Sequence, residues 1–471
     1  MTLTKCSRGN VIVTAFVPDC IIMKVNHHED CGGSNVDSRR RTIVSLCSLL
    51  VNLLPFLTYS LLVLQQHGTV TNFWPFAIFY AFRHSALLLF RDWAGQYQEL
   101  GKIGLVSGLL GAFCGLFGSL SPVGWDLSAV GLGLASSLFP TAVNQGKRVK
   151  ANRGSARRQH SPSEQLMQLV LIGALLLAVV LFQRPIIDFM ILFAASLAAL
   201  ISGQYWHLPV HVPKHIYWGN YLLAGVLFAA LFVIRVGRSV GIGQPIAWGV
   251  ALLALFLALL MILLLANWHR PLAAPVYYQQ AMFYGVCGQY WSMYSTIFVG
   301  AVAGVKLYYL VIVAYLAAIL FGRPFAKIVY RYLPGDRLAI NLALTTLGIG
   351  LTFWLPSYFL GIFLIRTFAS QVRQQTISEY ETATGNCQTS YIANYYYLTV
   401  GGLTAQLVMW TALLAFLKSN GVGSVLAAYA GHRLSVGALP AINSTHLLLA
   451  GYMLVYTAWL AVSRWCQRKH R

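Results

Sequence analysis

Long apolar runs constrain this chain more than any other feature. An α-helix rises 1.5 Å per residue, so about 20 apolar residues cross the roughly 30 Å hydrocarbon core of a bilayer. The runs do not alternate apolar and polar positions, as the strands of a membrane barrel do. We therefore predict an all-α polytopic membrane protein with about fourteen transmembrane helices. The predicted spans are 42–64, 73–90, 103–121, 124–143, 166–182, 186–205, 215–234, 245–267, 279–300, 306–321, 337–354, 356–371, 392–416 and 445–463.

Composition and charge agree with this class. The 471 residues are 58% hydrophobic and 10% charged, whereas soluble domains carry about 25% charged residues. With the N-terminus placed in the cytoplasm, 25 of the 33 Lys and Arg residues fall on the cytoplasmic side and 6 on the other. This bias follows the positive-inside rule. It predicts a multi-pass protein of the cell membrane with both termini cytoplasmic, and it accounts for the net charge of +21 without a nucleic-acid partner.

Enzymatic, metal and cofactor chemistry are not expected. The eight cysteines include no CxxC pair, and the sequence holds no GxxxxGK[ST] nucleotide-binding motif. Its twelve acidic residues are dispersed and do not cluster at one membrane face. The expected partners are membrane lipid and a small-molecule substrate, with the protein a monomer. The irregular composition at the start of the chain also makes Met23 an alternative start to Met1.

The chain divides into two similar halves. In each half the second span is followed by a charged loop and then by a glycine-rich span. Such parallel repeats are typical of secondary transporters. The predicted organisation is a cytoplasmic N-terminal tail, a six-helix bundle, a central two-helix insert, a second six-helix bundle and a basic cytoplasmic tail, at 1–41, 42–205, 206–275, 276–465 and 466–471.

The loops after the second and tenth spans carry a recognisable signature. Asp92 and Gly95 match the D-x-x-G core of a transporter motif, and Gly322, Arg323 and Lys327 form a basic second copy. With GLVSGLLGAFCGLFGSLSP and NYYYLTVGGLTAQLV, these features resemble the major facilitator superfamily, in its fourteen-span branch of drug:proton antiporters. The resemblance implies secondary active transport of a small amphipathic solute, with efflux as its direction and alternating access as its mechanism. It also implies that these five residues form gating loops.

The match to this branch is incomplete. Trp93, Gln96 and Tyr97 replace basic residues of the signature, and the fifth span holds one glycine, Gly173, with no Gly-Pro motif. A lipid-linked glycan or lipid flippase of another fold, and a non-transporting membrane protein, therefore remain alternatives.

Two arginines lie inside predicted spans. Arg83 and Arg366 are centred in apolar runs, where a buried charge costs about 2.5–3.5 kcal/mol. They either bond carbonyl or hydroxyl groups between helices or form an electropositive substrate site, one arginine from each half. Asp188 is the one acid within a span, so we expect a neutral, zwitterionic or anionic substrate. Asp188 and His84, whose type titrates near neutral pH, are the candidates for proton coupling.

Aromatic and amide side chains crowd the ninth span. Gln289, Tyr290 and Tyr294 lie within six residues of each other, and Tyr59 and Tyr396 occupy the first and thirteenth spans. We predict that these five residues line a substrate cavity, since amphipathic ligands bind in pockets of this composition. Interfacial aromatic anchoring and helix packing are the alternative interpretations.

Overall fold

The computed structural model describes residues 34–65, 70–90, 97–152, 184–202, 275–290, 294–303, 305–384, 390–417 and 438–469, with isolated residues between 170 and 229. Throughout these residues the regular secondary structure is helical, which confirms the all-α prediction. The helices are α1 (Ser34–Gln65), α2 (Val70–Phe90), α3 (Tyr97–Leu116), α4 (Pro122–Asn152), α6 (Pro185–Ile201), α9 (Pro275–Gln289), α10 (Ser295–Ala303), α11 (Val305–Tyr332), α12 (Arg337–Leu351), α13 (Leu355–Thr384), α14 (Ser390–Leu417) and α16 (Ala438–Lys469).

The apolar helices are those of a multi-pass membrane protein. Within the described ranges, six helical stretches are long and apolar enough to cross a bilayer, and α6 and α12 are shorter apolar helices. The six stretches are Arg40–Tyr59, Tyr97–Leu116, Pro122–Val149, Val313–Tyr332, Ser390–Leu417 and Ala438–Cys466. The predicted spans 166–182 and 245–267 lie almost entirely outside the described residues, as do the tail 1–33, most of the insert 206–275, Asp92 and Gly95. Span 215–234 is described only in part.

Several helices extend beyond the spans predicted from hydropathy. α11 continues to Tyr332, so Gly322, Arg323 and Lys327 lie on a helix, and their prediction as loop residues was wrong. α4 and α13 likewise continue through polar residues to Asn152 and Thr384. The physical reason is that apolar content marks the membrane-embedded part of a helix, whereas backbone hydrogen bonds and packing continue the helix beyond it.

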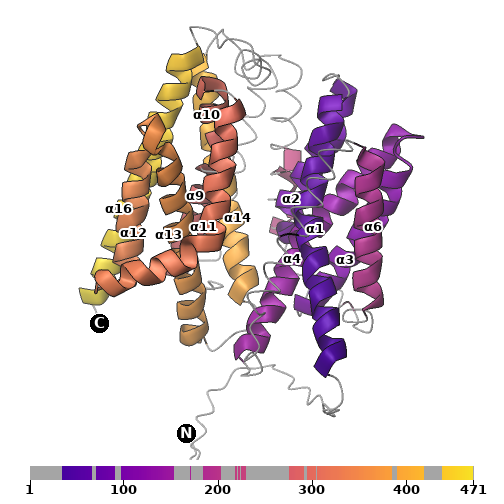
Figure 1. Cartoon of the computed structure of the whole chain (residues 1–471), viewed down its shortest axis with the longest axis horizontal. Coiled ribbons are helices and arrows are strands. Elements are labelled where there is room, and N and C mark those ends of the chain that lie inside the picture. Colours follow the sequence, from indigo (N-terminus) through magenta and orange to yellow (C-terminus); the bar gives the residue numbers. More distant parts are fainter. Residues whose placement is uncertain are drawn as a thin grey trace, which may run out of the picture.

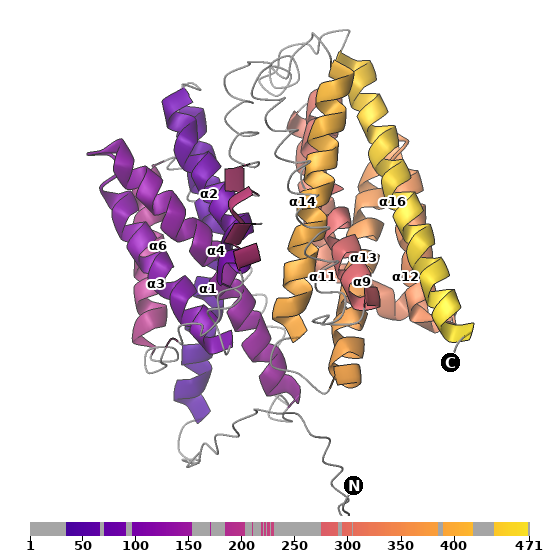
Figure 2. The same cartoon turned by 180° about the vertical axis from the view of Figure 1, so that it is seen from behind.

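The helices form two bundles that share one packing pattern (Figures 1 and 2). In the N-terminal bundle α4 packs on α3, α2 and α1, and α6 packs on α1 and α3. In the C-terminal bundle α13 packs on α12, α11 and α9, and α16 packs on α9, α10 and α12. α1 begins and α16 ends at the same side of the molecule, the lower side in Figure 1, which we call the terminus side.

Glycines allow close helix contacts in both bundles. A Cβ added at Gly111 of α3 would lie 2.7 Å from the backbone nitrogen of Leu132 in α4. In the counterpart pair, a Cβ at Gly348 of α12 would lie 2.9 Å from the carbonyl oxygen of Gly361 in α13. Small residues let backbones approach in this way within a membrane, where helix association depends on van der Waals packing.

The two bundles meet along α2, α4 and α14. Leu88 of α2 packs with Val400, Leu403 and Leu407 of α14 in one buried apolar cluster. Beside this cluster the Tyr80 hydroxyl donates a 2.8 Å hydrogen bond to Gln406 Oε1. We call the apolar cluster and this hydrogen bond together the bundle seam. Arg83, one of the arginines predicted for the substrate site, lies on α2 three residues from Tyr80.

Candidate functional site

Helix α13 presents two arginines toward the neighbouring helices of its bundle. Arg366 and Arg373 are seven residues apart, which is close to two helical turns and places both on one side of α13. Both side chains are partly buried. Arg373 was assigned to a loop from the sequence, because the apolar run ends near residue 371. The structure places it on the helix, so this assignment was wrong.

Arg366 lies among tyrosines. Its Nη1 donates a hydrogen bond to the hydroxyl of Tyr284 on α9. Its guanidinium carbon lies 5.4 Å from the centre of the Tyr284 ring and 5.1 Å from the ring of Tyr315 on α11. Such contacts stabilise a desolvated cation through the ring quadrupole.

Arg373 is held by the same tyrosine and by α14. Its Nε donates a 2.9 Å hydrogen bond to Asn394 Oδ1. Its guanidinium carbon lies 4.7 Å from the ring centre of Tyr391, 5.2 Å from that of Tyr284 and 5.9 Å from that of Tyr395. Tyr284 therefore contacts both arginines of α13.

Arg83 enters this region from the N-terminal bundle. Its Nη1 and Nη2 donate to the backbone oxygen and side-chain Oδ1 of Asn52 on α1, at 2.9 and 2.7 Å, and its guanidinium carbon lies 5.9 Å from the Phe79 ring centre. Tyr395 interacts electrostatically with both Arg83 and Arg373. We call Arg83, Arg366 and Arg373, with these tyrosines and the two asparagines, the arginine–tyrosine cluster.

The cluster is electropositive. In the part of the chain that the structure describes, neither Arg83 nor Arg373 contacts a carboxylate. The ion pairs Arg148–Glu381 and Arg464–Glu379 lie at the terminus side. A group of guanidinium ions with aromatic walls can bind the polar or anionic head of a solute and its apolar body together.

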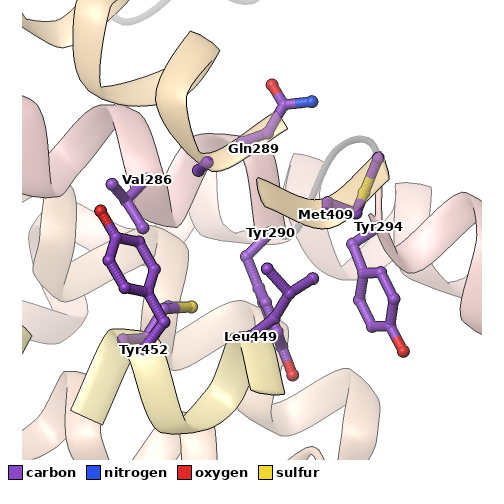
Figure 3. A pocket seen from close by; sticks show the side chains of 9 residues that line it. Val286, Gln289, Tyr290, Tyr294, Met409, Leu449 and Tyr452 are labelled. Atoms are coloured by element: carbon purple, nitrogen blue, oxygen red, sulfur yellow. The ribbon is translucent and has the colours of Figure 1, made fainter. Parts of the chain in front are cut away.

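The predicted residues of the ninth span gather around a separate small cavity. Its volume is about 10 Å³, enough for one water molecule. The Tyr290 hydroxyl lies 2.7 Å from Thr352 Oγ1, and Gln289 Nε2 is buried without a hydrogen-bond partner among the described residues. Figure 3 shows the lining side chains, which include Val286, Gln289, Tyr290, Tyr294, Met409, Leu449 and Tyr452.

The other predicted site residues are distributed over both bundles. Tyr59 is fully buried inside the N-terminal bundle, where its hydroxyl donates to Ser128 Oγ at 2.8 Å. Asp188 is buried and accepts a 2.9 Å hydrogen bond from Thr58 Oγ1. His84 packs against Tyr80 at the bundle seam, with ring centres 4.4 Å apart. Tyr396 lies beside the apolar cluster of that seam.

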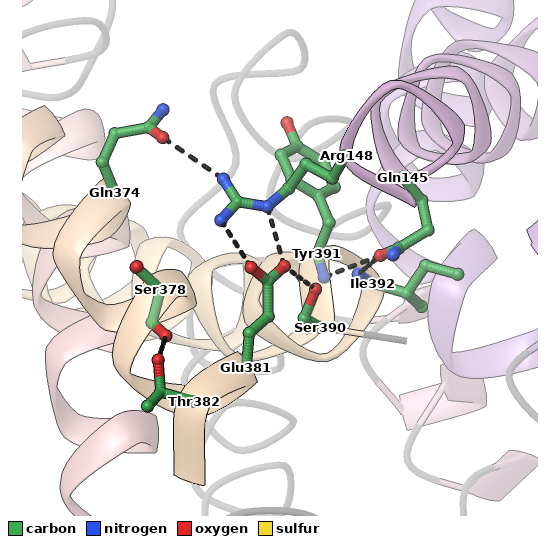
Figure 4. Close-up of polar contacts among 9 residues, drawn as sticks. All are labelled: Gln145, Arg148, Gln374, Ser378, Glu381, Thr382, Ser390, Tyr391 and Ile392. Carbon is green, nitrogen blue, oxygen red and sulfur yellow. Dashed lines mark hydrogen bonds and ion pairs between the residues drawn. The ribbon is translucent and has the colours of Figure 1, made fainter. Parts of the chain in front are cut away.

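A polar contact joins the bundles at the terminus side (Figure 4). Arg148 of α4 donates from Nε and Nη2 to the two carboxylate oxygens of Glu381 on α13, at 2.9 and 3.0 Å. Ser390 Oγ donates to the same carboxylate at 2.6 Å. We call this pair the Arg148–Glu381 latch. It was not predicted, because both residues were assigned to cytoplasmic loops.

A second contact lies beside the latch. Gln145 Oε1 of α4 accepts hydrogen bonds from the backbone amides of Tyr391 and Ile392, at 2.7 and 3.2 Å. These amides lie in the first turn of α14, where backbone N–H groups have no partner within the helix. The N-terminal bundle therefore caps a helix of the C-terminal bundle.

Comparison with known proteins gives the fold. No family model and no curated protein matches the chain. It is similar to solved structures that include the following three, at 11–15% identity. The first is a POT family transporter in complex with a thioalcohol-conjugated peptide, with a TM-score of 0.54 and 11% identity, covering 90% of this chain and 96% of that one. The second is a POT family transporter in complex with 5-aminolevulinic acid, with a TM-score of 0.52 and 11% identity, covering 92% of this chain and 97% of that one. The third is an auto-inhibited POT family peptide transporter, with a TM-score of 0.50 and 15% identity, covering 90% of this chain and 96% of that one. The likeness shows that the chain shares the polytopic helical fold of these proteins.

Proposed function

We propose that this protein is a secondary active transporter that moves a small amphipathic solute across the cell membrane by alternating access of its two bundles. The observation that carries the proposal is the arginine–tyrosine cluster, which draws side chains from both bundles. Charged groups inside a membrane are costly and usually face a partner or a solute pathway. Arg83 and Arg366 would contact polar groups of the solute, and the tyrosine rings its apolar body.

The proposal also includes the direction of transport and the orientation of the protein in the membrane. As in the fourteen-span antiporters that the sequence resembles, transport is outward and coupled to protons. The terminus side then faces the cytoplasm, and the latch closes the cytoplasmic side. A flux assay separates this function from the two alternatives, a flippase for lipid-linked glycans or lipids and a membrane protein that does not transport.

Removing either central arginine should abolish most transport. In proteoliposomes of purified protein, we expect Arg83→Ala and Arg366→Ala each to reduce the flux of a neutral, zwitterionic or anionic amphiphile about tenfold or more. A hydrogen bond to a charged group contributes about 1.5–3 kcal/mol, and 1.4 kcal/mol is a factor of ten. Arg337→Ala is the matched control, because Arg337 is exposed at the start of α12. Transport of cations that survives both substitutions would make the two arginines structural.

Asp188 is the proposed proton carrier. Asp188→Asn retains an oxygen that can accept the hydrogen bond from Thr58, but it cannot ionise. We expect the variant to lose at least nine-tenths of the stimulation by a pH gradient while it still exchanges solute across the membrane. Glu379→Gln, which neutralises a carboxylate at the terminus side, should keep its stimulation. A pH-gradient response unchanged in Asp188→Asn would assign the coupling to another group.

A further inference from the structure

Two buried nitrogen donors belong to one hydrogen-bonded pair of side chains in the arginine–tyrosine cluster. Arg373 Nη2 and Asn394 Nδ2 are both buried and have no hydrogen-bond partner among the described residues. Asn394 as a whole is 6% exposed. Because Arg373 Nε donates to Asn394 Oδ1, the orientation of the amide is fixed: only its oxygen can accept. The free Nδ2 group therefore belongs to the same bonded pair as the free Nη2 group.

The surroundings restrict what can bind there. The ring of Tyr391 lies 4.7 Å from the guanidinium carbon and that of Tyr284 lies 5.2 Å away, so aromatic groups occupy space around the ion. Asn394 also lines a small cavity of about 10 Å³, together with Tyr277, Thr376, Tyr380 and Tyr397. Its volume is that of a single water-sized group. Its lining residues lie on α9, α13 and α14 of the C-terminal bundle, so a larger ligand needs these helices to move apart before it reaches the donors.

The chemistry of the donors favours an oxyanion. Buried donors are normally paired, and an exception calls for an explanation. A guanidinium edge binds carboxylate oxygens in a fixed planar geometry, and the bond is stronger when both partners are charged. Two donors and one positive charge match the two oxygens and the single charge of a carboxylate.

The position along α13 agrees with a solute pathway. Arg373 lies seven residues beyond Arg366 and eight before Glu381. At 1.5 Å per residue, these separations are about 10 Å and 12 Å along the helix axis. The donor pair therefore lies between the centre of the cluster and the latch.

We infer that Arg373 and Asn394 form a carboxylate-binding subsite, and that the transported solute is a small amphipathic acid. The inference rests on the proposed function, which it deepens by naming the substrate class. The acid's carboxylate contacts Arg373 Nη2 and Asn394 Nδ2, and its apolar body lies against the tyrosines of α9 and α14.

The test compares an acid with its neutral isostere. Binding of 4-phenylbutyrate and of 4-phenylbutanamide is measured on purified protein by isothermal titration calorimetry. We expect the wild type to bind the acid at least tenfold more tightly than the amide. Arg373→Gln should reduce this ratio to about one, and the exposed control Arg337→Gln should leave it unchanged. 3-Phenylpropane-1-sulfonate identifies the oxyanion: binding as tight as that of the acid would overturn the carboxylate assignment.

A second variant keeps the test valid if Arg373→Gln fails to fold. Asn394→Asp supplies an internal carboxylate beside Arg373, so we expect an intact protein with a raised apparent melting temperature and no preference for the acid. A preference that persists in Asn394→Asp, or equal binding of acid and amide to the wild type, would overturn the inference and leave water as the partner of these donors.

Flux measurements separate this inference from the proposed function. If wild-type proteoliposomes transport the amide and the acid at equal rates, and this transport requires Arg366 but not Arg373, the transporter proposal holds and the subsite is overturned. If acid binding depends on Arg373 but no amphiphile crosses the membrane, the subsite holds and transport fails.

Discussion

Neutralising the Arg148–Glu381 latch is expected to open the terminus side of the molecule. Arg148→Ala and Glu381→Gln each remove a paired interaction that joins α4 to α13 at 2.9 and 3.0 Å. The side chains are 24% and 10% exposed, so solvent screens the pair only in part. Hydrogen bonds to charged groups contribute about 1.5–3 kcal/mol, and we therefore expect the open population to rise about tenfold or more.

Hydrogen exchange of α14 measures this opening directly. The amides of Tyr391 and Ile392 are bonded to Gln145 across the two bundles, so they lose their partner whenever the bundles separate. Both latch variants should exchange these amides about tenfold faster than wild type. The charge-swapped pair, Arg148→Glu with Glu381→Arg, should restore part of the protection.

The chain offers a matched control for the latch. Arg464 and Glu379 form an ion pair at 3.1 Å at the same side of the molecule, but between two helices of the C-terminal bundle. Arg464→Ala should leave exchange at the start of α14 unchanged. If it accelerates exchange as much as Arg148→Ala does, the Arg148–Glu381 pair is an ordinary peripheral contact and not a latch.

Gly285→Ala is expected to produce the largest loss of stability. The added Cβ would lie 1.9 Å from the carbonyl oxygen of Leu398 and 2.7 Å from the backbone nitrogen of Gly402. Backbone atoms cannot move aside as a side chain can, so α9 and α14 must separate. Overpacking typically costs about 1–3 kcal/mol, and we expect about 3 kcal/mol or more here. A scan of thermal unfolding by intrinsic fluorescence in detergent measures the effect.

Substitutions of glycines at other positions test whether the close α9–α14 contact causes the loss of stability. Gly401→Ala approaches the same interface from α14, where its Cβ would lie 2.3 Å from the carbonyl oxygen of Met282, and it should destabilise in the same direction. Gly451 of α16 has nothing within 4 Å of an added Cβ, so Gly451→Ala should unfold at nearly the wild-type temperature. Equal unfolding temperatures for Gly285→Ala and Gly451→Ala would contradict the α9–α14 packing.

Hydropathy predicted most helices but few of their ends. The predicted spans are interrupted at Pro122 and Pro185, and α4 and α6 begin at these residues, because proline is well accommodated in the first turn of a helix. The far ends were placed too early, since α11 and α13 continue through polar residues to Tyr332 and Thr384. Hydropathy reports the environment of a helix and not its hydrogen bonding.

The same limitation explains which site residues were found. Arg83 and Arg366 interrupt apolar runs, so their charge is conspicuous in the sequence. Arg373 and Arg148 follow the end of an apolar run and read as cytoplasmic anchors. The sequence did contain one indication for Arg373. It lies seven residues after Arg366, so both residues lie on one side of the helix if that helix continues beyond the apolar run. Nothing in the sequence pairs Arg148 with Glu381, because that contact joins residues 233 positions apart.

The chemistry of the aromatic side chains does not by itself distinguish a tyrosine that lines a solute pathway from one that is bonded inside its bundle. Tyr59, Tyr290 and Tyr294 are polar enough to line a solute pathway, yet each hydroxyl is bonded within its own bundle, to Ser128, Thr352 and the carbonyl of Ile442 respectively. A tyrosine in a membrane needs such a partner whether or not a solute passes. The identity of the partner comes from the packing of helices distant in sequence.

The latch has a consequence for the opened molecule. Its two charges belong to different bundles, so separation leaves a guanidinium ion on one wall of the mouth and a carboxylate on the opposite wall. An electric field then crosses the gap between the two walls, and it orients dipolar molecules there. The released amides of α14 carry partial positive charge on the carboxylate side and offset part of this field. For the proposed transporter, mobile ions weaken this field, so solute entry from this side should slow as ionic strength rises, while passage through the membrane interior should not.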